Sequence, residues 1–182
     1  MTSAKEVNKV SVLTPVLENH LLWDVLSWKT PASTNLQLSS YRLSHGIIPH
    51  ENCVITKIGF YLENKTGAGS NLAVEIWSDS GGDPDAVIAN GSVIIAVENL
   101  VASSMNWCTF ATPPSLTGGT KYHVVFRGSD IAAGNYWDLY VYDGFPANGL
   151  GWWGPGSVGQ HDTGGGWSVF DSPITAIYGR KV

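Results

Sequence analysis

Four segments of this chain alternate between apolar and polar side chains with a period of two. In residues 53–63, for example, Ile58, Phe60 and Leu62 alternate with Gly59, Tyr61 and Glu63. The segments are CVITKIGFYLE (53–63), NLAVEIWSD (71–79), TKYHVVFRG (120–128) and NYWDLYVYDG (135–144), and we expect the last strand in ITAIYGRK (174–181). Successive side chains of a strand point to opposite faces of a sheet, so the pattern predicts strands with one buried and one wet face. Such strands are typical of antiparallel sheets.

Turn-forming stretches separate these segments, and no helical pattern lies between them. The separators are NKTGAGSN, SDSGGDPD, PPSLTGGT, SDIAAGN and YDGFPANG. Short strands spaced in this way predict an all-β fold, namely an antiparallel two-sheet sandwich that is jelly-roll-like. With 182 residues, of which 43% are hydrophobic and 14% charged, the chain can bury a core and does not resemble a disordered protein.

Residues 1–35 differ from the rest, and we expect an N-terminal arm or edge element there, followed by the sandwich in residues 36–182. The segment PVLENHLLWDVLSW has near-helical apolar spacing but fits a strand equally well. Ser33, Thr34 and Asn35 look like a connection into a further strand, LQLSSYRL. The apolar residues of the arm require a partner surface, either the chain's own sandwich or a neighbouring subunit.

Several classes of function find no support in the sequence. The net charge is −5 with no basic run, so we expect no nucleic-acid partner. No apolar stretch approaches the length of a membrane span, so we expect no membrane-spanning segment. No nucleophile elbow, zinc-protease motif or P-loop is found, so we expect a protein that is not an enzyme. Cys53 and Cys108 can form a disulfide or stand as two buried thiols, and the sequence leaves both alternatives open.

Three stretches resemble a β-sandwich module of phage virion and bacterial surface proteins. They begin at ITKIGFYLENKTGAGSNLAVEIWSDSGGDPDAVIANGSV, continue with NWCTFATPPSLTGGTKYHVVFRG, and end with NYWDLYVYDGFPANG and GGGWSVFDSPITAIYG. Domains of this kind are described as "choice-of-anchor" or carbohydrate-binding-module-like. The resemblance covers about residues 50–180 and implies a jelly roll, but such modules serve as binders, adhesins and structural virion parts alike.

The stretch NGLGWWGPGSVGQHDTGGGW (148–167) is the first candidate for a glycan-binding site. Trp152, Trp153 and Trp167 offer flat apolar faces to sugar rings, and His161 and Asp162 offer polar partners to hydroxyl groups. Alternatively, the glycines let this loop fold back so that its tryptophans seal one end of the sandwich.

The wet face of the predicted sheets is the second candidate. It carries Tyr61, Trp77, His123, Arg127, Tyr140 and Tyr142. In a jelly roll, a concave face often holds an extended ligand. Alternatively, these are ordinary exposed positions that shield sheet edges.

A third candidate is the acidic turn DSGGDPD, where Asp79, Asp83 and Asp85 could bind a structural calcium ion through carboxylate oxygens. The spacing is not that of an EF-hand, and a plain hairpin turn explains the same residues. Apart from this ion, we expect no cofactor.

These observations together predict a non-enzymatic virion accessory or structural protein, such as a capsid decoration, head-fibre or tail component. Its sandwich would face outward and contact cell-surface or mucus glycans. Residues 1–30 would dock on capsid or tail proteins or on sister subunits. The sequence leaves the oligomeric state open, and a homotrimer would favour the virion role. The N-terminus lacks the apolar region of a secretory signal. The alternative is an extracellular or cell-surface carbohydrate-binding or lectin-like domain of a secreted bacterial protein whose signal has been removed.

Overall fold

The computed structural model describes most of the chain from residue 41 onward and two short segments before it. The described residues are 20–24, 32–36, 41–66, 71–128, 136–142, 159–162, 164–170, 172–173 and 175–182. Apart from one 3-10 turn, η1 (Val97–Asn99), the regular structure of these residues is β-strand. The strands are β1 (His20–Asp24), β2 (Ala32–Leu36), β3 (Arg42–Ile47), β4 (Cys53–Thr66), β5 (Leu72–Ser80), β6 (Asp83–Ile95), β7 (Ser104–Thr109), β8 (Ser115–Leu116), β9 (Tyr122–Gly128), β10 (Tyr136–Tyr142), β11 (Gly159–Asp162), β12 (Trp167–Phe170), β13 (Ser172–Pro173) and β14 (Thr175–Lys181).

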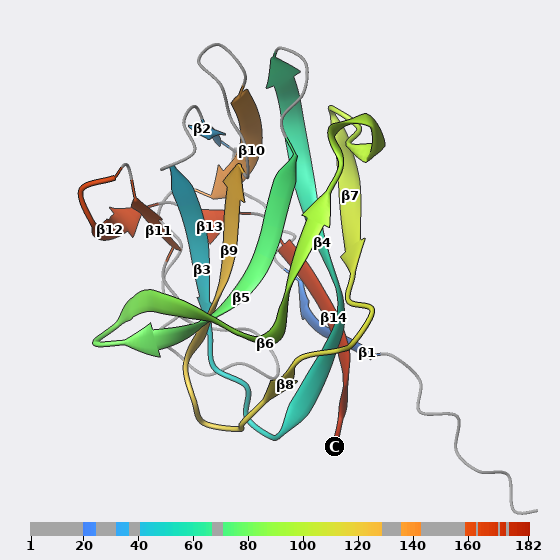
Figure 1. The fold of residues 1–182 in the computed structure, drawn as a ribbon, viewed down its shortest axis with the longest axis vertical. Coiled ribbons are helices and arrows are strands. Elements are labelled where there is room, and N and C mark those ends of the chain that lie inside the picture. The colour runs from blue at the N-terminus through green and yellow to red at the C-terminus, as the bar shows by residue number, and fades with distance from the viewer. Residues whose placement is uncertain are drawn as a thin grey trace, which may run out of the picture.

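The strands form two antiparallel sheets packed as a jelly-roll-like sandwich, which confirms the predicted fold class (Figure 1). The six-stranded sheet has the order β12-β11-β3-β9-β5-β6. In the eight-stranded sheet, the long strand β4 pairs with β14 and β10 on one side and with β7 and β8 on the other. Strand β1 pairs with β14, and β2 and β13 pair with β10.

The core lies between the sheets and is built from the apolar faces that the period-two pattern predicted. Phe60 of β4 and Phe126 of β9 are fully buried and meet across the two sheets in an edge-to-face contact, with ring centroids 5.3 Å apart. Ile76 of β5 and Leu139 of β10 belong to the same buried cluster. Side chains at odd positions of β5 and β9 therefore point away from this core.

The N-terminal region departs from prediction at two places. Ser33, Thr34 and Asn35 are not a connection but part of β2, where Thr34 lies opposite Leu139 of β10. The predicted strand LQLSSYRL is not continuous either, because β2 ends at Leu36 in one sheet and β3 begins at Arg42 in the other. Strand β2 forms because the side of β10 that faces away from β4 has backbone N–H and C=O groups that need hydrogen-bond partners. For residues 20–24 the structure gives the strand alternative, since β1 pairs with β14.

The two cysteines are free thiols in this structure. Both Cys53 and Cys108 are buried in the core, which is the second of the two alternatives that the sequence left open. Burial raises the pKa of Cys53 to about 11 and that of Cys108 to about 12. In the part of the chain that the structure describes, no helix has the length and apolar character needed to cross a membrane.

Candidate functional site: the outer face of the six-stranded sheet

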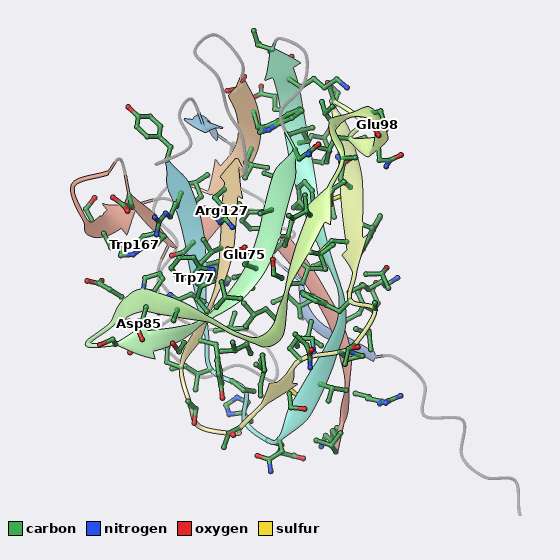
Figure 2. All side chains as sticks on the ribbon, in the orientation of Figure 1. Glu75, Trp77, Asp85, Glu98, Arg127 and Trp167 are labelled. Carbon is green, nitrogen blue, oxygen red and sulfur yellow. The ribbon has the colours of Figure 1, made fainter. Side chains whose placement is uncertain are left out.

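The outer face of the six-stranded sheet carries a group of charged and aromatic side chains, although the face is largely buried. Strand β5 places Glu75, Trp77 and Asp79 on it, and β9 places His123 and Arg127 beside them. Figure 2 shows Glu75, Trp77 and Arg127 grouped on these strands, with Trp167 nearby. We call this surface the outer face below.

Glu75 is the centre of the polar network on the outer face, and its side chain is 2% exposed. Arg127 donates to it twice, from Nε to Oε2 at 2.9 Å and from Nη2 to Oε1 at 2.8 Å. The indole Nε1 of Trp77 donates to Oε2 at 2.9 Å, and the Ser92 hydroxyl donates to Oε1 at 3.0 Å. Burial alone would raise the pKa of Glu75, but these hydrogen bonds and the Arg127 charge outweigh it and hold the pKa below its usual value. Glu75 is thus a fixed carboxylate that orients Trp77.

Trp77 connects this network to the glycine-rich segment. Its ring meets Trp167 of β12 edge to face, with centroids 6.5 Å apart and an interplanar angle of 78°. The guanidinium of Arg42, from β3, lies 5.3 Å from the Trp77 ring centroid, within the range of a cation–π contact. Trp77 is only 9% exposed, whereas Trp167 is half-buried. Trp167 is therefore the more accessible of these two indoles.

The turn between β11 and β12 explains why glycines accompany Trp167. Asp162 Oδ1 accepts hydrogen bonds from the backbone N–H groups of Gly164, at 2.7 Å, and Gly166, at 3.0 Å. Both glycines have positive φ, 97° and 114°, which other residues rarely adopt. In the register, Asp162 lies opposite Trp167 on one side and Arg42 on the other. Asp162 thus shapes the hairpin that brings Trp167 to the outer face.

The acidic turn carries its own set of contacts. Asp79 Oδ1 accepts from His123 Nε2 at 2.8 Å and lies 3.2 Å from Lys121 Nζ, while Oδ2 accepts from the Gly82 N–H at 3.1 Å. Burial lowers the pKa of His123, and the neighbouring Asp79 only partly offsets this. Asp85, at the exposed tip of the β5–β6 hairpin (Figure 2), accepts from the Ser78 hydroxyl at 3.3 Å. Among the described residues, no group of three or more metal-ligating side chains comes together.

The structure brings some predicted site residues together and separates others. Trp77, Trp167 and Asp162 converge on the outer face, together with His123 and Arg127. The remaining candidates in the described strands are His161, in β11 of the same sheet, and Tyr61, Tyr140 and Tyr142, in the eight-stranded sheet. Trp152 and Trp153 lie outside the described residues. The tyrosines therefore do not share a sheet with Trp77.

Sequence reasoning missed Arg42 and the structural role of Glu75. The signal for Glu75 was present, because an acidic residue two positions before a tryptophan on one strand face can accept from its indole. Nothing local indicated Arg42, whose contact with Trp77 depends on β9 lying between their strands.

Comparison with models of protein families, with curated proteins and with solved structures gave no match to this chain.

Proposed function

We propose that this protein is a non-enzymatic virion accessory protein that binds glycans through the outer face of its six-stranded sheet. The observation that carries the glycan part is the Trp77–Trp167 pair, held in place by a buried acid on one side and a glycine hairpin on the other. Half-buried Trp167 offers an indole edge and face to the C–H groups of a sugar ring, while Trp77 supports it from beneath. Arg42 stands next to the pair as a polar partner for hydroxyl groups, while the buried Asp162 holds the hairpin that carries Trp167.

The fixed state of Glu75 supports a binding role over a catalytic one. A glycosidase needs one carboxyl group that holds a proton and a second carboxylate opposite it. Hydrogen bonds from three residues hold the pKa of Glu75 below its usual value and occupy both of its carboxylate oxygens, so Glu75 serves as scaffold. Trp152, Trp153, His161, Tyr140 and Tyr142 stay candidate glycan contacts. The calcium site at Asp79, Asp83 and Asp85 stays a prediction from the sequence and is not part of this proposal, because Asp79 already contacts His123 and Lys121.

The virion setting is based on the resemblance of residues 50–180 to modules of phage virion and bacterial surface proteins. In this proposal, residues 1–30 contact capsid or tail proteins or sister subunits, and within them β1 also pairs with β14 of its own chain. The alternative is a carbohydrate-binding domain of a secreted bacterial protein. Light scattering of the purified chain separates the two, because a symmetric homotrimer supports the virion role and a monomer supports the alternative.

The glycan proposal is tested on an array of neutral glycans with two tryptophan variants. Trp167→Ala removes the accessible indole of the outer face, and we expect binding to weaken by at least about tenfold. Trp107→Ala is the matched control, because Trp107 is an exposed indole on the other sheet, and we expect unchanged binding to neutral glycans. If the wild-type protein binds no neutral glycan, or if Trp167→Ala binds as tightly as wild type, the proposal is wrong.

A further inference from the structure

The outer surface of the eight-stranded sheet carries a second aromatic cluster, formed by Lys57, Trp107 and Tyr178. These residues come from three adjacent strands, since β4 pairs with both β7 and β14, and Lys57 lies opposite Tyr178. The Trp107 and Tyr178 rings meet edge to face, with centroids 5.6 Å apart. We call these three residues the lysine platform.

A glycine seats the indole of the platform. Gly59 lies directly opposite Trp107 in the register of β4 and β7. A side-chain carbon added at Gly59 would stand 2.6 Å from the nearest ring carbon of Trp107 and 2.8 Å from two others, so the ring lies against the bare backbone. Trp107 is nevertheless 44% exposed, one of the few large apolar side chains in the described residues that face solvent to this extent. The result is an indole whose position is fixed from below while part of its surface stays open.

The ammonium group of Lys57 is held by the two rings. Its Nζ lies 4.3 Å from the centroid of Tyr178 and 4.7 Å from that of Trp107, which are both cation–π distances. Among the described residues, no carboxylate lies within ion-pair distance of Lys57. Arg180, two residues beyond Tyr178, points to the same side of β14. A protein of net charge −5 thus presents a positively charged aromatic patch here.

We infer that the lysine platform binds an acidic sugar residue, one that carries a carboxylate or sulfate group. Its C–H face would pack on Trp107 and its anionic group would meet the ammonium of Lys57, a charge-assisted contact that a neutral sugar cannot make. A saccharide fits better than a protein surface, because the apolar area is about one indole wide and stable protein interfaces bury about 800 Å² on each partner. This site is separate from the outer face of the six-stranded sheet, so it neither requires nor replaces the function proposed above.

The test compares acidic sugars with neutral counterparts, and the second pair isolates the charge most closely because it differs only by a methyl ester. The probes are 3′-sialyllactose against lactose, and a galacturonate oligomer against its methyl ester, each titrated by calorimetry onto the full chain. We expect the wild-type protein to bind at least one acidic probe and to bind its neutral counterpart about tenfold more weakly or not at all. If neither acidic probe binds, or if the neutral counterpart binds equally well, the inference is overturned.

Four variants locate the site. Lys57→Gln and Trp107→Ala should each weaken binding of the acidic probe by about tenfold or more. Lys181→Gln removes the same charge from an exposed lysine that is paired with Glu51, so it should bind the acidic probe as wild type does. Trp167→Ala reports separately on the outer face of the six-stranded sheet. Equal loss in Lys57→Gln and Lys181→Gln would mean general charge attraction and would overturn the inference. Loss in Trp167→Ala alone would assign the acidic sugar to the outer face instead.

Discussion

Replacing Glu75 with glutamine tests whether the buried carboxylate holds the outer face together. The substitution keeps the size of the side chain but removes the charge that receives two hydrogen bonds from Arg127. It also leaves only one acceptor oxygen, whereas Arg127, Trp77 and Ser92 now donate to both oxygens of the carboxylate. Breaking a fully buried ion pair costs about 3–5 kcal/mol. Arg127 is 31% exposed and can regain part of its hydration, so we expect a loss of about 2 kcal/mol in the free energy of unfolding. For a chain of this size that corresponds to a melting temperature lower by about 4–8 °C.

The assay is urea denaturation of wild type, Glu75→Gln and a matched control, Glu51→Gln. Glu51 also pairs with a cation, Lys181 at 2.8 Å, but both side chains are about half exposed, and surface pairs of this kind contribute under about 1 kcal/mol. If the two variants lose the same stability, burial is not what gives the Glu75 network its strength, and the reasoning is refuted.

The pH dependence of the same two proteins gives a second check. The pKa of Glu75 is lower in the folded protein than its usual value of 4.5, so the carboxylate stabilises the fold above that pH and the contribution is lost as pH falls through the folded pKa. The difference in unfolding free energy between wild type and Glu75→Gln should therefore be constant above about pH 5 and narrow below it. A difference in unfolding free energy that widens as the pH falls would contradict the lowered pKa of Glu75.

Three further expectations concern His45, the two cysteines and Asp79. Burial, with a smaller effect of the nearby His123, lowers the pKa of His45 from 6.5 to about 4, so between these pH values the unfolded chain binds a proton at His45 that the folded protein does not. The free energy of unfolding should therefore fall by about 3 kcal/mol from pH 6.5 to pH 4. Urea midpoints that stay constant over this range would contradict the expectation. Cys53 and Cys108 should react with a thiol reagent only after unfolding, and rapid labelling of the native protein would contradict their burial. Because Asp79 is already engaged by His123 and Lys121, EDTA should leave the melting temperature unchanged, whereas a drop that calcium reverses would establish the calcium site.

The strands with an apolar face were predictable because their pattern is local. Alternation in residues 53–63 depends only on each side chain pointing away from the previous one, and Ile58, Phe60 and Leu62 are all fully buried. Strand β6 was harder to find, since most of its side chains are exposed or half-buried and leave no alternation to detect. The opposite problem arose at Ser33, Thr34 and Asn35. These residue types are typical of turns, but here they form strand β2 because it pairs with β10.

The candidate site could be predicted only in its parts. Trp77 and Trp167 were each identifiable as aromatic candidates, but they are far apart in sequence and meet because the β11–β12 hairpin adds to the edge of β3. Strand order depends on long-range pairing that no local pattern encodes. For the same reason, Tyr140 could not be assigned to a different sheet from Trp77 before the pairing of β10 with β4 was known.

Trp77 and Trp107 illustrate two ways of fixing an indole on a sheet, with different consequences for binding. Ordering a mobile side chain costs free energy on binding, so a binding surface benefits when its rings are held beforehand. Trp77 is held by a hydrogen bond to a buried charge and becomes almost fully covered, so it acts mainly through the neighbour that it supports, Trp167. Trp107 is held by shape, against the bare backbone of Gly59, and keeps nearly half of its surface open. The first arrangement depends on the charge of Glu75 and the second does not, so the two faces should respond independently to substitution of that acid.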